Sequence, residues 1–199
     1  MYLFFTLITL YKLIVATTAT NQVGYDFSSS GYIENPIDFY SQTFRQLNGK
    51  TLHLKQFKHK VVLITNVASE CGYTQTNYKE LADLKNEFGE DLEIFLMPSN
   101  EFGQQEAGNA KQIIEFIKNQ IGNESNFLFL EKGYTNGEFQ HALYSWLKQV
   151  TKTQDRNVKW NFETKFIVSK DGKWVYRFSG SFSPFKLKPT LEHFLNTKL

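Results

Sequence analysis

The strongest constraint on the fold is a continuous apolar run at residues 61–67, VVLITNV, in which β-branched side chains predominate. Apolar side chains at successive positions are typical of a strand in a sheet that is covered on both faces. A turn of small residues follows, then a helical pattern at residues 76–88, and then a second apolar run at residues 92–97. A buried strand, a helix and another buried strand in this order predict a parallel β-α-β unit.

Both ends of the predicted helix at residues 76–88 carry local signals. Asn77 and Glu80 have the three-residue spacing of a capping box, in which two side chains satisfy free backbone N–H groups. Gly89 follows the last apolar position and is expected to end the helix, because glycine adopts left-handed backbone conformations without steric cost.

Two dipeptides predict β-hairpins on either side of this unit. Asn48-Gly49 lies between alternating segments within residues 39–54. Asp171-Gly172 separates the segments at residues 159–168 and 173–180. Both dipeptides favour the tight turns that connect antiparallel strands.

Three further helices and a short strand complete the predicted elements. The helices are expected at residues 110–120, 139–150 and 187–195, and the strand is expected at residues 127–130. In the helix at residues 110–120, the side chains expected in the core are Ile113, Ile114 and Ile117. The whole order predicts an α/β, thioredoxin-like fold, in which a central mixed β-sheet is flanked by helices.

The composition indicates one folded domain. The chain has 199 residues, of which 41% are hydrophobic and 16% aromatic, so it is long enough to bury a full core. Its formal charge is only +2, with basic and acidic residues mixed, and we therefore expect no nucleic-acid partner. The polar residues 21–38 are expected to form a flexible lead-in to a domain at residues 39–199.

The first twenty residues, MYLFFTLITLYKLIVATTAT, differ from the rest of the chain. Their apolar run is interrupted by Lys12 and is too short for a comfortable membrane span, and small residues follow at Ala16 and Ala19. We expect a cleaved signal peptide at residues 1–20, and hence a secreted protein or one in the lumen of the secretory pathway. An uncleaved anchor or a buried strand is the alternative, since a basic n-region is missing. The sequon at Asn123 would then be available for glycosylation.

The chain contains a single cysteine, Cys71. One cysteine cannot form an internal disulfide or a cysteine-based zinc site. The four histidines are scattered along the sequence without the spacing of metal ligands, at positions 53, 59, 141 and 193. We therefore expect neither a metal nor a bound cofactor.

Cys71 stands between a predicted buried strand and a predicted helix. In an open α/β sheet this edge is where sites form, and backbone N–H groups and the positive end of the helix dipole favour a thiolate there. A thiolate is the form of cysteine that attacks a peroxide oxygen. A small buried hydrophobic residue is the alternative role of a lone cysteine.

Four segments resemble the glutathione peroxidase family, in the order in which that family has them. They are residues 66–74 (NVASECGYT), 98–108 (PSNEFGQQEAG), 129–148 (FLEKGYTNGEFQHALYSWLK) and 160–162 (WNF) followed by Lys165-Phe166. The resemblance extends from about Phe39 to Phe194. It implies a catalytic tetrad in which Cys71 is the peroxidatic residue and Gln105, Trp160 and Asn161 are its partners. Neutral amide and indole N–H groups can stabilise a thiolate or sulfenate without suppressing its nucleophilicity.

The sequence departs from the family pattern at several positions. Glu101 stands where the family usually has Gln, Ala107 where it usually has Pro, and Ser99 where Cys is common. One additional residue separates Trp160 from Lys165. The helix at residues 110–120 lacks the resolving cysteine of thioredoxin-dependent members, and the short segment at residues 151–159 lacks the insertion of tetrameric members, which favours a monomer.

The resemblance implies a thiol-dependent peroxidase that reduces hydrogen peroxide and organic or lipid hydroperoxides in the response to oxidative stress. Glutathione or another small thiol would be the reducing co-substrate. A dithiol oxidoreductase is excluded, because Thr74 stands where the second cysteine of a CxxC pair would be. A secreted redox sensor or thiol-oxidising binding protein with little turnover is the alternative.

Overall fold

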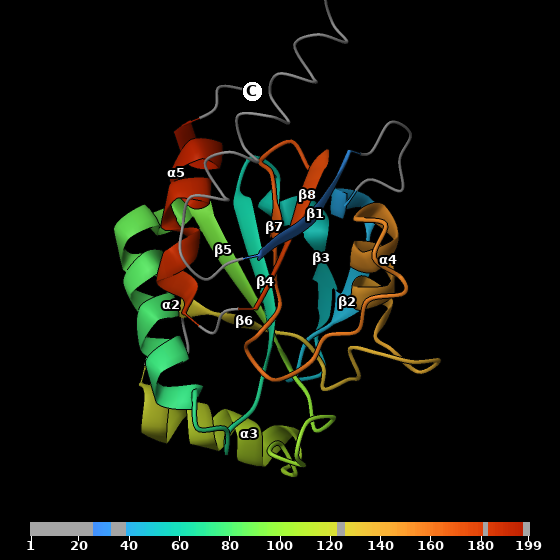
Figure 1. The fold of residues 1–199 in the computed structure, drawn as a ribbon. Coiled ribbons are helices and arrows are strands. Elements are labelled where there is room, and N and C mark those ends of the chain that lie inside the picture. The colour runs from blue at the N-terminus through green and yellow to red at the C-terminus, as the bar shows by residue number, and fades with distance from the viewer. Residues whose placement is uncertain (1–25, 33–38, 123–125, 181–182, 197–199) are drawn as a thin grey trace, which may run out of the picture.

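The computed structural model describes residues 26–32, 39–122, 126–180 and 183–196, and a six-stranded sheet lies at its centre (Figure 1). The strand order is β1-β8-β7-β4-β5-β6. The strands are β1 (Asp26–Tyr32), β4 (Val61–Val67), β5 (Leu92–Pro98), β6 (Leu128–Phe129), β7 (Lys165–Val168) and β8 (Trp174–Ser179). Because β4 pairs in parallel with β5 and antiparallel with β7, the sheet is mixed, as predicted.

Both predicted hairpins are confirmed. A separate two-stranded sheet joins β2 (Thr43–Arg45) to β3 (Thr51–His53), and β7 and β8 pair across the second turn. Gly49 and Gly172 have φ values of 82° and 71°, a left-handed conformation that favours glycine. The Asn48 side chain also accepts a 3.0 Å hydrogen bond from the Lys50 backbone N–H.

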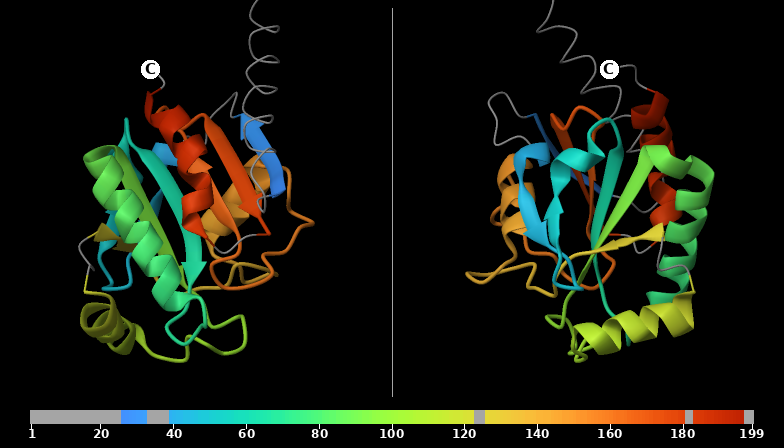
Figure 2. Two further views of the ribbon diagram at one scale, coloured as in Figure 1. Left: turned by 60° about the vertical axis from the view of Figure 1, so that its left-hand side comes forward. Right: turned by 180° about the vertical axis from the view of Figure 1, so that it is seen from behind.

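Within the described residues, four α-helices lie around the sheet (Figure 2). They are α2 (Thr74–Phe88), α3 (Ala110–Phe116), α4 (Ala142–Val150) and α5 (Lys188–Asn196), and a π-helical turn at Ile117–Ile121 continues α3. Helices α2 and α5 cover one face, α4 and the β2–β3 hairpin cover the other, and α3 lies across one end. Short 3₁₀ turns occur at Phe39–Ser41, Leu54–Phe57, Gly89–Asp91 and Pro184–Leu187.

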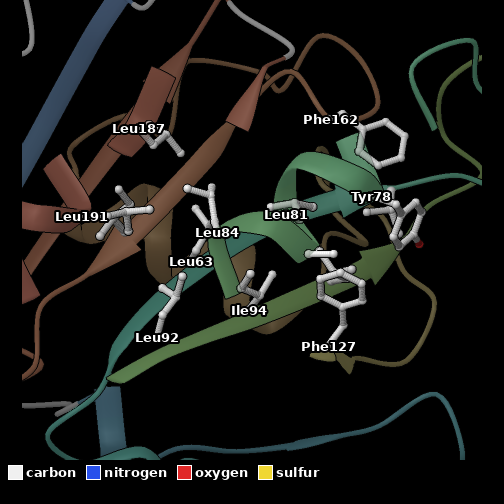
Figure 3. Packing of buried hydrophobic residues seen from close by; sticks show 14 of the residues in the cluster. Leu63, Tyr78, Leu81, Leu84, Leu92, Ile94, Phe127, Phe162, Leu187 and Leu191 are labelled. Carbon is white, nitrogen blue, oxygen red and sulfur yellow. The ribbon is translucent and has the colours of Figure 1, made fainter. Parts of the chain in front are cut away.

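Every residue of β4 is buried, which confirms the prediction of a strand covered on both faces. Alternate side chains enter two separate cores: Leu63 packs toward α2 and α5, whereas Val62 and Ile64 pack toward α4. Figure 3 shows Leu81 and Leu84 of α2 against Leu63 and other members of the first core. Burial of each such leucine stabilises the fold by about 1.5–3 kcal/mol.

The predicted capping box of α2 was wrong. The helix begins at Thr74, with Tyr73 as its N-cap, and the Asn77 amide donates to the Tyr73 carbonyl at 3.0 Å. Glu80 instead accepts a 2.6 Å hydrogen bond from Ser183, more than a hundred residues along the chain. A distant partner therefore overrides the local spacing. The predicted C-cap at Gly89 is confirmed.

Two helix predictions also need correction. Ile113 and Ile117 are buried, but Ile114 is 39% exposed, because the next position on a helix lies about 100° around its axis. Helix α4 begins at Ala142 rather than at residue 139, and Phe139 is 80% exposed. His141 caps this helix: its Nδ1 accepts a 3.2 Å hydrogen bond from the Leu143 backbone N–H.

The expected lead-in at residues 21–38 contains an edge strand instead. Residues Asp26–Tyr32 form β1, which pairs antiparallel with β8. Backbone hydrogen bonds hold this strand, so its sequence carries little of the apolar signal by which a strand is recognised. Residues 1–20 and the sequon at Asn123 lie outside the described residues. Among the described helices, none combines the length and apolar character of a membrane span.

Candidate active site

Three segments meet at the end of the sheet where β4 and β5 finish, at the bottom of Figure 1. They are the loop after β4, the loop after β5 and the segment that leads into β7. The backbone N–H of Ser99 donates to the Val67 carbonyl at 3.0 Å, and that of Phe162 donates to the Asn66 carbonyl at 3.0 Å. These bonds extend the pairing of the strands into the loops, so the sheet itself determines how the three segments are spaced.

Cys71 lies in the turn between β4 and α2, and its side chain is only 7% exposed. Its carbonyl accepts a 3.0 Å hydrogen bond from the Thr74 N–H, and the Thr74 hydroxyl donates to the Ala68 carbonyl at 2.7 Å. These two hydrogen bonds join the residues before and after the cysteine and so hold the turn closed. The free thiol faces the core beneath α2, close to the N-terminal end of that helix.

Gln105 and Asn161 are in direct contact. The Asn161 side chain is fully buried, and its Nδ2 donates to Gln105 Oε1 at 3.2 Å and to the Phe102 carbonyl at 3.4 Å. Asn66, on β4, donates through its own Nδ2 to Asn161 Oδ1 at 3.1 Å. A chain of amides therefore runs from the central strand to Gln105. Sequence reasoning assigned no role to Asn66, although it belongs to the first family motif.

Trp160 packs against the loop after β5, at Phe102 and Gly103. Its ring centroid is 6.0 Å from that of Phe102. A Cβ added to Gly103 would come within 3.3 Å of the Trp160 ring and 3.5 Å of the Gln105 side chain. Glycine at this position, with a φ of 61°, therefore lets Trp160 and Gln105 approach each other.

Two residues beside the site have strained backbones. Gln104 and Phe162 have φ values of 55° and 64°, a left-handed conformation that is costly for side chains other than glycine. Each is the immediate neighbour of a tetrad residue, Gln105 or Asn161. Strain of this kind persists where the surroundings enforce it, and it is concentrated at functional sites.

The nucleophile loop is joined to the Gln105 segment by two hydrogen bonds. The Glu70 N–H donates to the Gln105 carbonyl at 3.0 Å, and the Ser69 hydroxyl donates to Glu106 Oε1 at 2.8 Å. Burial raises the pKa of Glu106, while the hydrogen bonds from Ser69 oppose that shift. A hollow of about 380 Å³ opens beside this junction, lined by Ser69, Glu70, Gln105, Glu106 and residues of α3. Sequence reasoning missed Glu106, whose neighbour Gln105 was the residue assigned from the same motif.

The structure thus brings three of the predicted site residues, Gln105, Trp160 and Asn161, into one cluster. Cys71 is tied to that cluster through the backbone of the adjacent residue. Within the described residues, the Cys71 thiol has no hydrogen bond from any of the three side chains, so their action on sulfur stays a prediction. No group of three or more potential metal ligands occurs in the part of the chain that the structure describes.

Comparison with known proteins identifies the family. The model of the glutathione peroxidase family matches residues 39–148. "Probable glutathione peroxidase 8" of Arabidopsis thaliana is 37% identical over 82% of this chain and 97% of that protein. The chloroplastic "phospholipid hydroperoxide glutathione peroxidase" of Pisum sativum is 40% identical over 71% of this chain and 60% of that protein. The crystal structure of Trgpx in apo form is 30% identical, with a TM-score of 0.62, over 80% of this chain and 96% of that chain. With this family match and a thioredoxin-like sheet whose only cysteine lies at the expected edge, the chain belongs to the glutathione peroxidase family of thiol-dependent peroxidases.

Proposed function

We propose that this protein reduces hydrogen peroxide and organic hydroperoxides with Cys71 as the peroxidatic nucleophile. The main support is the position of the only cysteine, on a loop whose backbone is hydrogen-bonded to the Gln105 segment at 3.0 Å. Gln105 in turn contacts Asn161, and the Trp160 ring lies beside both Phe102 and Gly103. Side chains with neutral N–H donors therefore belong to the segments to which the cysteine loop is joined.

The first half-reaction oxidises Cys71. The thiolate attacks one oxygen of the O–O bond, an S–O bond forms, and the other oxygen leaves as water or an alcohol after it takes up a proton. The products are Cys71 sulfenic acid and the reduced peroxide. The amide N–H groups of Gln105 and the indole N–H of Trp160 stabilise the negative charge as it moves from sulfur to the leaving oxygen, while Asn161 orients Gln105 through its own Nδ2.

The second half-reaction needs an external thiol, because the chain has no other cysteine. A small thiol such as glutathione condenses with the sulfenic acid, releases water and leaves a mixed disulfide on Cys71. A second thiol then attacks that disulfide, which regenerates the Cys71 thiol and releases oxidised glutathione. Thioredoxin is expected to be a poor reductant, because it acts best on a protein disulfide that this chain cannot form internally.

Lipid hydroperoxides are proposed as substrates as well. The support is the name of the Pisum sativum relative, a phospholipid hydroperoxide glutathione peroxidase, together with the short segment at residues 151–159. The same short segment supports a monomeric enzyme. A secreted protein, or one in the secretory lumen, is proposed from the composition of residues 1–20.

Mass spectrometry tests the proposed cycle directly. Enzyme treated with one equivalent of hydrogen peroxide and limiting glutathione should carry a glutathione adduct confined to Cys71, and excess glutathione should sustain peroxide consumption. Rapid turnover with thioredoxin in the absence of any adduct would contradict the small-thiol route. Stoichiometric oxidation of Cys71 without turnover on either reductant would instead indicate a sensor, which membership of the peroxidase family does not favour.

A further inference from the structure

A partly buried polar network lies behind the site, between the loop after β5 and helix α4. Glu101 is at its centre: one carboxylate oxygen accepts hydrogen bonds of 2.7 Å from both the N–H and the hydroxyl of Thr135. The other oxygen accepts a 2.5 Å hydrogen bond from Asn136 Nδ2. Glu101 departs from the Gln expected at this position, and the contacts give that departure a physical reason, because a carboxylate accepts all three bonds without donating.

Asn136 connects Glu101 to the backbone segment that carries Trp160. Its Oδ1 accepts a 2.8 Å hydrogen bond from the Val158 N–H, and its Nδ2 donates to the Val158 carbonyl at 2.9 Å. Both backbone groups of one residue are therefore held by one amide side chain, as a neighbouring strand would hold them. Val158 is buried and lies two residues before Trp160.

A buried cation fixes the orientation of the Asn136 amide. Lys148 Nζ donates to Asn136 Oδ1 at 2.9 Å and to Gln140 Oε1 at 3.2 Å, and the lysine is only 2% exposed. A lysine can only donate, so it forces the oxygen of Asn136 toward itself and the nitrogen toward Glu101. Burial and the nearby Arg177 lower the pKa of Lys148 to about 8, and the charge of Glu101 opposes that shift.

The same network reaches Trp160 from a second side. Phe102 directly follows Glu101, its ring packs at 6.0 Å from the Trp160 ring, and its carbonyl accepts from Asn161. Glu101 therefore anchors the residue against which the indole rests, while Asn136 anchors the backbone from which the indole projects. The network can therefore set the position of the tryptophan without contacting Cys71.

We infer that Asn136 is a positioning residue for Trp160, held in one orientation by Glu101 and Lys148, and that it thereby sets the rate at which Cys71 is oxidised. The inference rests on the proposed function, in which the Trp160 indole stabilises the charge that develops on the leaving oxygen of the peroxide. Misplacement of a reacting group by about 1 Å can cost about 10²-fold in rate, so a loosened Trp160 segment should be visible in kinetics.

The test compares Asn136→Ala with Gln140→Ala in single-turnover oxidation by hydrogen peroxide, followed by quenching and mass spectrometry of Cys71. Gln140→Ala is the matched control, because it also removes an acceptor of Lys148 but leaves Val158 held. Asn136→Ala should slow oxidation by about tenfold or more, and Gln140→Ala should react at nearly the parent rate. Alkylation of Cys71 by iodoacetamide, which does not need the indole, should change less than about twofold in both.

If Asn136→Ala folds poorly, two further variants, in which the charges at positions 136 and 101 are changed, still test the inference. N136D places two carboxylates against each other and should slow oxidation. N136D combined with E101Q removes that repulsion and keeps an acceptor for the Val158 N–H, but it leaves the Val158 carbonyl without its donor, and it should therefore regain part of the rate. Equal oxidation rates for Asn136→Ala, Gln140→Ala and the parent would overturn the inference. So would equal losses of peroxide and iodoacetamide reactivity in Asn136→Ala. A parent whose Cys71 does not react with hydrogen peroxide would contradict the proposed function itself.

Discussion

At the scale of single residues, the site depends on amide groups whose orientation is fixed by their partners. Asn161 is the link: it receives a hydrogen bond from Asn66 at 3.1 Å and gives one to Gln105 at 3.2 Å. The direction of these two bonds leaves the Gln105 NH₂ group free of Asn161 and able to donate elsewhere. A hydrogen-bond donor that is already oriented before the reaction stabilises the charge that develops in the transition state.

Removal of either proposed donor should slow the chemical step. Gln105→Ala and Trp160→Ala should each reduce the rate of sulfenic acid formation by about 10²-fold, the effect expected when one preorganised donor is lost. Stopped-flow measurement of the oxidation of Cys71 by hydrogen peroxide checks this. Gln104→Ala is a suitable control for the loop, since Gln104 is exposed and lies beside Gln105. If Gln105→Ala and Trp160→Ala both oxidise at the parent rate, the assignment of the tetrad is wrong.

At the scale of elements, the segment between Asn161 and β7 contains an unusual buried lysine. Lys165 begins β7, its side chain is fully buried, and its Nζ donates to the carbonyl of Phe162, the residue with a left-handed backbone. Burial is the main cause that lowers the pKa of Lys165, from 10.5 to about 7, while the nearby Glu163 opposes the shift. The additional residue between Trp160 and Lys165 is thus accommodated in a turn that a buried amine closes.

This lysine should make stability depend on pH. Between pH 7 and pH 10.5 the unfolded chain binds a proton at Lys165 that the folded chain does not, so the free energy of unfolding rises with pH. Urea unfolding at pH 7 and pH 9 should show that the parent gains about 2 kcal/mol more than Lys165→Met. Lys118→Met, at an exposed lysine, should behave like the parent. Equal gains for the parent and Lys165→Met would contradict the buried, deprotonated amine.

The elements also show how far the sequence alone leads. Burial on both faces of β4 and the turns at Gly49 and Gly172 were predictable, because each depends on neighbouring residues. The start of α2 was not, since Glu80 bonds to Ser183 instead of capping its own helix. In the site, the motifs identified Gln105 and Asn161, but the roles of Asn66 and Glu106 depend on hydrogen bonds between distant segments, which no local pattern encodes.

At the scale of the whole molecule, the mixed sheet carries the site at one end and separates two cores. The first core lies beneath α2 and contains Cys71, whereas the second lies beneath α4, and Trp160 packs against both. The tryptophan therefore stands where the two halves of the fold meet. Through Trp160, the network proposed on the α4 side has a packed route to the cysteine on the α2 side.

The proposed processing of the chain is also a property of the whole molecule. When the protein is made in its own secretory system, we expect the mature chain to begin near Asn21 and the sequon at Asn123 to be available for a glycan. N-terminal sequencing and intact-mass measurement before and after deglycosylation check both points. A chain that retains Met1 would favour the uncleaved anchor instead.

The most direct test of the central claim is peroxide reduction by Cys71→Ser beside the parent. Both proteins should give the same circular dichroism and similar unfolding midpoints, because serine differs from cysteine by one atom in a side chain that is 7% exposed. The parent should consume one equivalent of hydrogen peroxide without reductant and turn over with glutathione. Cys71→Ser should do neither, since a hydroxyl has a negligible anion population at neutral pH. Peroxide consumption by folded Cys71→Ser at the parent rate would contradict Cys71 as the nucleophile.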